Sequence, residues 1–150
     1  MATLFVDTSA LVKRYILTET GAAAMRTLFD APDIVVLIAR VTPVEVASAF
    51  SRRQREGKIS PAQRESLWKA FRLHLAADYD MIEPDEEVWR TAERLIIDHP
   101  LRAYDAVQLA SALRASVIAG GDPPGFRFCT ADLRQAAAGE REGLAVELIA

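Results

Sequence analysis

The chain has 150 residues, of which 51% are apolar and 26% are charged, and its formal net charge is −3. A chain of this length suits one domain with a sizeable core, and its apolar fraction is too high for a disordered protein. The longest apolar run, Ile34–Ala39, is far shorter than the roughly 20 residues of a membrane-spanning helix. The single cysteine, Cys129, excludes an internal disulfide. We therefore expect residues 1–150 to form one soluble, cytoplasmic domain without membrane contact.

The first half of the chain alternates apolar runs with helix-forming segments. We expect a strand over residues 3–6, helices over 10–17 and 18–30, a strand over 34–38, and helices over 42–57 and 61–77. The last two helices begin with similar signatures, Thr42-Pro43-Val44-Glu45 and Ser60-Pro61-Ala62-Gln63. Each has a capping hydroxyl, proline at the first helical position, and an acid or amide three residues after the cap. These two helices are predicted to form a hairpin with a basic turn at Arg52–Lys58.

The second half of the chain continues the alternation of strands and helices. We expect a strand over 81–83, helices over 84–98 and 102–119, a turn-rich loop over 120–125, a strand over 126–129, a short helix capped by 130–132, and a last strand over 146–149. Such alternation favours a parallel sheet with helices on both faces. The sequence therefore predicts a three-layer α/β/α fold with a mostly parallel central sheet and a helical hairpin.

Four acidic residues stand where strands give way to helices. Asp7 follows the first strand directly, and Glu45 lies at the start of the helix after the second strand. Asp105 lies in the first turn of the helix over 102–119, and Asp132 lies just past the strand over 126–129. Ligands of parallel α/β sheets bind beyond the carboxyl ends of the strands. We therefore expect the four carboxylates to gather at one edge of the sheet.

Such a gathering of like charges indicates a cation. Two unit charges about 4 Å apart interact by roughly 1–4 kcal/mol at dielectric constants from 80 down to 20. The carboxylates must therefore take up protons or bind a hard divalent ion. Oxygen ligands suit Mg²⁺ or Mn²⁺, which bridge to phosphate oxygens and activate a water molecule. The pattern predicts metal-dependent phosphodiester hydrolysis without a covalent enzyme intermediate.

Each of these acids also has a purely structural interpretation. The structural roles are helix caps for Asp7 and Asp132, a capping box with Thr42 for Glu45, and an ion pair with Arg102 for Asp105. Ser9 and Thr130 are placed either to cap helices or to hydrogen-bond a carboxylate. Spacing alone leaves these alternatives open.

Four segments, LFVDTSALVKRY, TPVEVASAF, LRAYDAVQLASAL and FCTADLRQAA, resemble the PIN-domain ribonucleases, specifically the VapC-type toxins of type II toxin–antitoxin systems. The resemblance spans essentially the whole chain, in the order of the family's motifs. It implies that Asp7, Glu45, Asp105 and Asp132 form the acidic catalytic pocket. Asp7 and Asp105 would be the main Mg²⁺ ligands, with Mn²⁺ as a substitute. Asp132 would complete the metal environment, and Glu45 would orient or help to activate the water.

The resemblance also implies partners. Members of the family cleave RNA, commonly tRNA or rRNA, and are inhibited by a small cognate antitoxin of the VapB type. They commonly form homodimers. One departure concerns the residues after the fourth acid, where family members often carry a further acidic or polar residue and Leu133-Arg134-Gln135 offers only Gln135. The number of metal ions is therefore left open.

Three alternative functions are compatible with parts of the pattern. A PIN-fold nuclease that processes RNA or acts on DNA, without a toxin role, would need the same acids. A phosphatase with Asp7 as nucleophile is less favoured, because Ser9 stands where the second acid of such enzymes is expected and no lysine follows in the later motifs. A non-catalytic binding module is disfavoured by the presence of all four acids.

Overall fold

The computed structural model describes residues 2–120 and 125–150. Its strands form one parallel five-stranded sheet, in the order β3-β2-β1-β4-β5. The strands are β1 (Ala2–Val6), β2 (Ile34–Ala39), β3 (Tyr79–Ile82), β4 (Phe126–Thr130) and β5 (Val146–Leu148). The order reverses between β1 and β4, because the chain first builds the sheet outward through β2 and β3 and then returns to the other side of β1.

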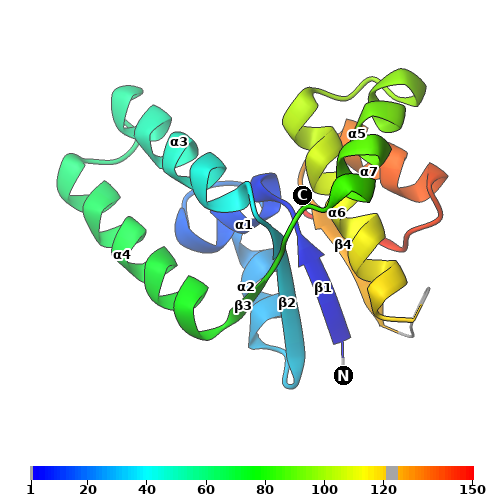
Figure 1. The fold of residues 1–150 in the computed structure, drawn as a ribbon. Helices are drawn as coiled ribbons and strands as arrows, with labels where there is room; N and C mark the ends of the chain where they lie inside the picture. The colour runs from blue at the N-terminus through cyan, green and yellow to red at the C-terminus, as the bar shows by residue number, and fades with distance from the viewer. Residues whose placement is uncertain (1, 121–124) are drawn as a thin grey trace.

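The helices occupy both faces of this sheet (Figure 1). They are α1 (Thr8–Tyr15), α2 (Ala22–Asp30), α3 (Thr42–Arg55), α4 (Pro61–Ala77), α5 (Glu86–Asp98), α6 (Ala103–Ile118) and α7 (Leu133–Arg141). In Figure 1 the hairpin of α3 and α4 extends to the left, while α5, α6 and α7 gather on the right. None of the helices in the described ranges is long and apolar enough to cross a membrane.

Alternation along the strands divides the core into two clusters. Leu4 and Val6 of β1 belong to the cluster covered by α1–α4, whereas Phe5 belongs to the cluster covered by α5–α7. Ile38 and Ala39 of β2 divide in the same way. Strands buried on both faces are continuously apolar, which explains the unbroken run in β2. The predicted three-layer parallel architecture with a helical hairpin is confirmed.

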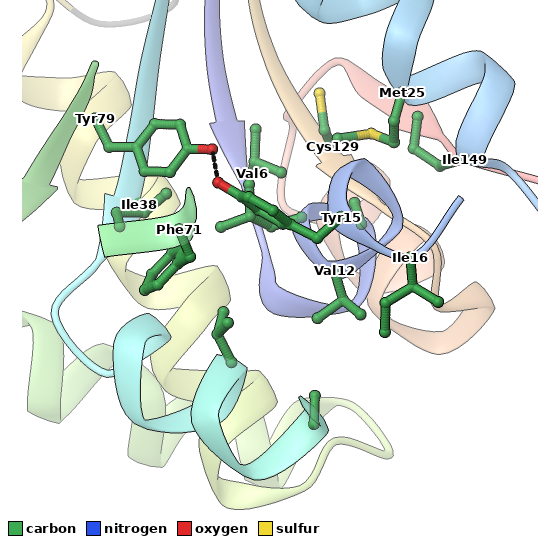
Figure 2. Close-up of a cluster of buried hydrophobic side chains, with 14 of the residues drawn as sticks. Val6, Val12, Tyr15, Ile16, Met25, Ile38, Phe71, Tyr79, Cys129 and Ile149 are labelled. Carbon is green, nitrogen blue, oxygen red and sulfur yellow. Dashed lines mark hydrogen bonds between the residues drawn. The ribbon is translucent and has the colours of Figure 1, made fainter. Parts of the chain in front are cut away.

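The cluster under α1–α4 is rich in aromatic side chains (Figure 2). The Tyr15 ring meets the Phe71 ring edge-on, with centroids 5.9 Å apart. The hydroxyls of Tyr15 and Tyr79 face one another and are hydrogen-bonded at 2.5 Å. These contacts join α1 and α4 to the first residue of β3.

Several local predictions differ from the structure at element boundaries. The helix α1 spans Thr8–Tyr15 and so lies two residues earlier than the expected 10–17. The second helix begins at Ala22 rather than at residue 18, because Gly21 stands at its N-cap with a left-handed φ of 94°. A methyl group at Gly21 would also come within 2.9 Å of the Ile149 side chain. β3 begins at Tyr79, which pairs with Val36, rather than at residue 81. The predicted loop over 120–125 falls largely on residues 121–124, outside the described ranges.

A further difference concerns the two helix-start signatures. Ser60 accepts a hydrogen bond from the Gln63 backbone N–H, and the Gln63 side chain accepts one from the Ser60 backbone N–H. This capping box at α4 is confirmed. At α3, however, Val41 is the N-cap and makes no side-chain capping bond, so Thr42 lies inside the helix. The predicted capping role of Thr42 is therefore wrong.

Candidate active site

A cavity of about 520 Å³ lies beyond the carboxyl ends of β1 and β4. Its walls include all four acids singled out from the sequence: Asp7, Glu45, Asp105 and Asp132. β1 and β4 are the neighbours between which the strand order reverses. In parallel α/β sheets this position forms a natural crevice for ligands. The fold thus brings together carboxylates that are up to 125 positions apart in the chain, from Asp7 to Asp132.

Asp7 is almost fully buried, with 4% of its surface exposed. Its carboxylate caps α1 by accepting the Ala10 backbone N–H at 3.1 Å, and it also accepts the hydroxyls of Ser9 at 2.7 Å and Thr130 at 2.6 Å. Burial raises its pKa to about 7; the three hydrogen bonds oppose this shift and the charge of Asp105 adds to it. Asp7 therefore has both roles considered from the sequence, as a helix cap and as a wall of the cavity. Ser9 and Thr130 hold its carboxylate in place.

Glu45 is directed by contacts from two other helices. Its Oε1 accepts the Thr8 hydroxyl at 3.0 Å and the Gln108 side-chain amide at 2.7 Å. The Gln108 amide, on a side chain that is 2% exposed, also approaches the Thr42 hydroxyl at 2.9 Å. Burial raises the pKa of Glu45, and these hydrogen bonds moderate the shift. The capping-box explanation of Glu45 does not hold, since Thr42 and Glu45 both bond to Gln108 instead.

Sequence reasoning missed Gln108, Thr8 and Thr42 as parts of this site. Gln108 lies three residues after Asp105 in α6, among buried alanine, serine and leucine residues. A buried amide in such a helix needs hydrogen-bond partners. The position of Gln108 as a lone amide in an apolar stretch was therefore the feature of the sequence that could have pointed to it. Its partners on α1 and α3 could not be read from local spacing.

Asp105 and Asp132 form the other side of the cavity. Asp132 caps α7 by accepting the backbone N–H groups of Arg134 at 2.8 Å and Gln135 at 3.0 Å. The buried Gln135 side chain donates to the Asp105 backbone carbonyl at 2.8 Å and so fixes the first turn of α6. Burial, and then the charge of Asp132, raise the pKa of Asp105. The alternative ion pair between Asp105 and Arg102 does not close within the described chain, but the backbone N–H and the charge of Arg102 both lower the pKa of Asp105.

The four acids interact electrostatically through Asp105. Its charge raises the pKa of Asp7 and that of Glu45, and the charge of Asp132 in turn raises the pKa of Asp105. Like charges that share a site disfavour ionisation in this way. Perturbed carboxylates in a cleft are characteristic of functional sites.

The basic residues of the same cavity do not neutralise these acids. Lys13 and Arg53 both line it, but both pair with Glu19, whose carboxylate also accepts two hydrogen bonds from Arg53. Arg52 lies 3.9 Å from Glu56, the residue that directly follows α3. Among the described residues, no lysine or arginine forms an ion pair with any of the four acids. Apart from the charge of Arg102, which lowers the pKa of Asp105, the acids are therefore left with little compensation.

The donor set bears on which metal suits the site. The available ligands are oxygens of carboxylates and hydroxyls. In residues 2–120 and 125–150, no three or more His, Cys, Asp or Glu side chains are close enough together to enclose a metal ion. Mg²⁺ does not need such a cage, because it retains several waters and binds through one or two carboxylates plus substrate phosphates. The residues fit a hydrated hard cation and do not fit a closed zinc site.

Comparison with known proteins agrees with this fold. The sequence model of the PIN domain matches residues 4–140. Two curated relatives from Mycobacterium tuberculosis, Ribonuclease VapC45 of strain CDC 1551 and Ribonuclease VapC49 of strain H37Rv, are each 35% identical over 130 residues. Each match covers 82% of this chain and 80% of the relative. The chain therefore belongs to the PIN-domain family and, within it, to the VapC-type proteins.

Solved structures of VapC proteins share the fold at low sequence identity. Mycobacterium tuberculosis VapC20, a toxin that cleaves the sarcin–ricin loop, superposes with a TM-score of 0.66 at 16% identity, covering 91% of this chain and 95% of that one. VapBC-1 from nontypeable Haemophilus influenzae gives a TM-score of 0.63 at 13% identity, covering 97% of both chains. PIN-domain ribonucleases in general depend on a divalent metal ion.

Proposed function

We propose that this protein is a Mg²⁺-dependent endoribonuclease toxin, held inactive by a VapB-type antitoxin. The observation that carries the proposal is the cavity lined by Asp7, Glu45, Asp105 and Asp132, none of which forms an ion pair with a cation among the described residues. Support for RNA as substrate comes from the relatives named ribonucleases. Support for an antitoxin comes from the VapBC assemblies among the structural neighbours. A toxin that acts on cellular RNA would work in the cytoplasm.

Asp7 and Asp105 would hold the Mg²⁺ ion, or Mn²⁺ in its place, with Asp132 completing the negative environment. When bound, such an ion supplies an activated water and offsets the charge that develops on the phosphate. Asp7 suits this role because its carboxylate is fixed by Ser9 and Thr130 before any ligand arrives. A preorganised ligand lowers the cost of assembling the site.

Glu45 would accept the proton of the attacking water. Both of its hydrogen bonds fall on Oε1, so Oε2 has no partner within the described chain. Its raised pKa makes it a better proton acceptor than an exposed glutamate. Thr8 and Gln108 keep its orientation fixed while Oε2 takes up the proton.

Direct attack by water is favoured over attack by a side chain. The hydroxyls of Ser9 and Thr130 are bonded to Asp7, and the Thr8 hydroxyl is bonded to Glu45. Asp7 itself, buried and held by three donors, is poorly placed to act as the nucleophile of a phosphatase. The reaction therefore proceeds without a covalent enzyme intermediate.

The enzymatic part is tested by RNA cleavage with purified protein and labelled RNA in Mg²⁺ or Mn²⁺. We expect Asp7→Asn and Asp105→Asn to lower the cleavage rate by about 1,000-fold or more, since each removes a charge that holds the ion. Asp30→Asn is the matched control, because Asp30 is exposed at the end of α2 and lies outside the cavity. Wild-type rates in both active-site variants would overturn the assignment.

The biological part is tested by brief expression in cells, followed by sequencing of RNA ends, with Asp7→Asn as the inactive reference. Discrete new ends in tRNA or rRNA, suppressed when a small adjacent antitoxin gene is co-expressed, are expected. Cleavage of DNA, or of RNA without suppression by any antitoxin, would instead support a PIN-fold nuclease without a toxin role. Light scattering on the purified protein tests the expected homodimer.

A further inference from the structure

A second cavity of about 860 Å³ adjoins the first. The two share Glu45, Tyr104, Asp105, Ala131 and Asp132, so they form one continuous trough that passes over the acids. Pro100, Arg102, Leu133 and Arg134 are among the residues that line only the second cavity. The two cavities are therefore the two arms of this trough. A chain-like ligand whose reacting group lies at the acids can extend from the first arm into the second.

The cations of the two arms differ in their availability. In the first cavity, Lys13 and Arg53 are engaged by Glu19, and Arg52 lies 3.9 Å from Glu56. In the second, Arg102 and Arg134 are exposed, and neither guanidinium forms an ion pair within the part of the chain that the structure describes; the charge of Arg102 acts on Asp105, whose pKa it lowers. Arginine binds phosphate oxygens through two parallel hydrogen bonds, and a free guanidinium needs no existing pair to be broken first.

An exposed aromatic ring stands where the two cavities meet. Tyr104 is 57% exposed, and its hydroxyl has no hydrogen-bond partner among the described residues. The Leu133 side chain in the second cavity is 73% exposed. Most large apolar side chains of this protein are buried, so an exposed aromatic ring at this place calls for an explanation. Tyr104 lies beside the two arginines and next to Asp105 in sequence. This combination fits a planar ligand that carries phosphate.

We propose that the second cavity binds the nucleotide next to the scissile phosphate of single-stranded RNA, with Tyr104 stacked on its base and Arg102 and Arg134 bound to the phosphate beyond it. The inference rests on the proposed ribonuclease function and adds a subsite to it. Single-stranded RNA is the occupant that fits, because a ring can stack only on a base that has been freed from its helix. The free cations place this nucleotide in the arm of Arg102 and Arg134 rather than in the arm of Lys13 and Arg53.

The test measures binding of a labelled single-stranded RNA to the Asp7→Asn protein, which does not cleave it, and KM for the same RNA in the wild-type background. We expect Tyr104→Ala to raise Kd and KM by about 5- to 150-fold, the range that corresponds to the loss of one stacked base. Tyr104→Phe keeps the ring and is expected to bind within about twofold of the parent protein. Trp89→Ala is the control, since Trp89 is an exposed aromatic on α5 outside both cavities.

The phosphate contacts have a separate signature. Arg102→Gln and Arg134→Gln are each expected to weaken binding and to reduce the slope of log K against log salt by about 0.7. Arg90→Gln, at an exposed position of α5, should leave the slope unchanged. A duplex of the same sequence should be insensitive to Tyr104→Ala.

The outcomes separate this inference from the proposed function. If the wild-type protein cleaves RNA but Tyr104→Ala leaves Kd and KM unchanged, or Tyr104→Phe is as damaging as Tyr104→Ala, the subsite is overturned and the ribonuclease stands. If these variants weaken only the antitoxin complex, the trough binds a peptide and the inference is again overturned. If no RNA is cleaved in Mg²⁺ or Mn²⁺, the ribonuclease proposal fails, while the binding series still decides whether the trough holds single-stranded RNA.

Discussion

Two clusters of buried polar groups lie at opposite ends of α1. They differ in whether the protein itself supplies the partners that the buried groups need. At the carboxyl end, Arg14 donates to the Tyr79 hydroxyl at 2.5 Å. The hydroxyls of Tyr79 and Tyr15 are hydrogen-bonded at 2.5 Å (Figure 2). The Tyr15 hydroxyl also lies 2.8 Å from His74 Nδ1. Burial lowers the pKa of His74 and raises that of both tyrosines, so these three groups stay neutral. In this tyrosine cluster (Arg14, Tyr15, His74 and Tyr79), the buried groups find their hydrogen-bond partners within the protein.

At the amino end of α1, the protein supplies no ion-pair partner for the carboxylates of the acidic site among the described residues. Asp7, Glu45 and Asp105 each have a raised pKa because burial and neighbouring acids disfavour their charge. Hydroxyl and amide donors moderate the cost without removing it. Burial of polar groups therefore does not by itself mark a functional site. The mark is a buried charge whose partner the chain does not supply, so that its cost is relieved by a proton or by a ligand.

Asp7→Asn is expected to have the largest effect on stability. It should stabilise the metal-free protein by about 2–4 kcal/mol at pH 8, because it removes a buried charge from the acidic site. The pKa of Asp7 rises from 3.8 to about 7 on folding. Between these two values the unfolded chain releases its proton first, so wild-type stability falls as the pH rises, and above about pH 7 the loss is complete. The gain of the variant should therefore grow from about pH 4 to pH 7 and then stay level.

Urea unfolding in chelator, across this pH range, measures the effect. Added Mg²⁺ should raise wild-type stability and leave Asp7→Asn nearly unchanged, because only the wild type offers the buried charge to the ion. A variant that is less stable than the wild type at pH 8 without metal would show that the acidic site is not strained.

The next effect concerns how Glu45 is held. Gln108→Leu removes the amide whose hydrogen bond lowers the pKa of Glu45, so that pKa should rise further. We expect the acidic limb of the pH–rate profile to move to higher pH, and cleavage at neutral pH to fall by about 10- to 100-fold.

Gln135→Leu is the matched control, since Gln135 is equally buried but bonds to the backbone carbonyl of Asp105 rather than to a carboxylate. Both variants should lose about 1–2 kcal/mol of stability. If both shift the pH–rate profile equally, or neither does, then Gln108 is only structural.

The sequence sufficed for the sheet, the helices and the meeting of the four acids, because these depend on local patterns: apolar strands that end in an acid, and helix starts marked by proline and hydroxyls. It did not suffice for the contacts of Gln108, which lies 66 residues from Thr42 and reaches it only in the folded protein, where α6 and α3 come from opposite faces of the sheet. The Thr42-x-x-Glu45 pattern was misleading for the same reason. A local capping box and a tertiary hydrogen bond use the same side chains, and packing decided between them.

The tyrosine cluster gives the complementary case. His74 has no recognisable partner in the sequence, yet it bonds to Tyr15, which is 59 residues away. Tyr15→Phe should cost about 1–2 kcal/mol of stability, because it leaves the buried Tyr79 hydroxyl and His74 without their common partner. RNA cleavage should stay within about twofold of the wild type, since these groups lie outside the cavity of the acids. A larger loss of activity would mean that the two ends of α1 are coupled.

The smallest expected effect lies at the rim of the acidic site, where Glu19 engages Lys13 and Arg53. Hydrogen bonding to Arg53 holds the pKa of Glu19 below its usual 4.5, so the pair stabilises the fold above that pH and is lost as the pH falls through the lowered value. Glu19→Gln should therefore cost about 0.5–1 kcal/mol at pH 7 and less at pH 3. It also frees two cations beside the acids, so single-stranded RNA should bind slightly more tightly at low salt, by about twofold. Stability measured at both pH values, together with RNA affinity at two salt concentrations, checks this. If affinity falls, Glu19 does not neutralise those cations but positions them for the substrate, and the first arm of the trough would then bind RNA as the second is proposed to do.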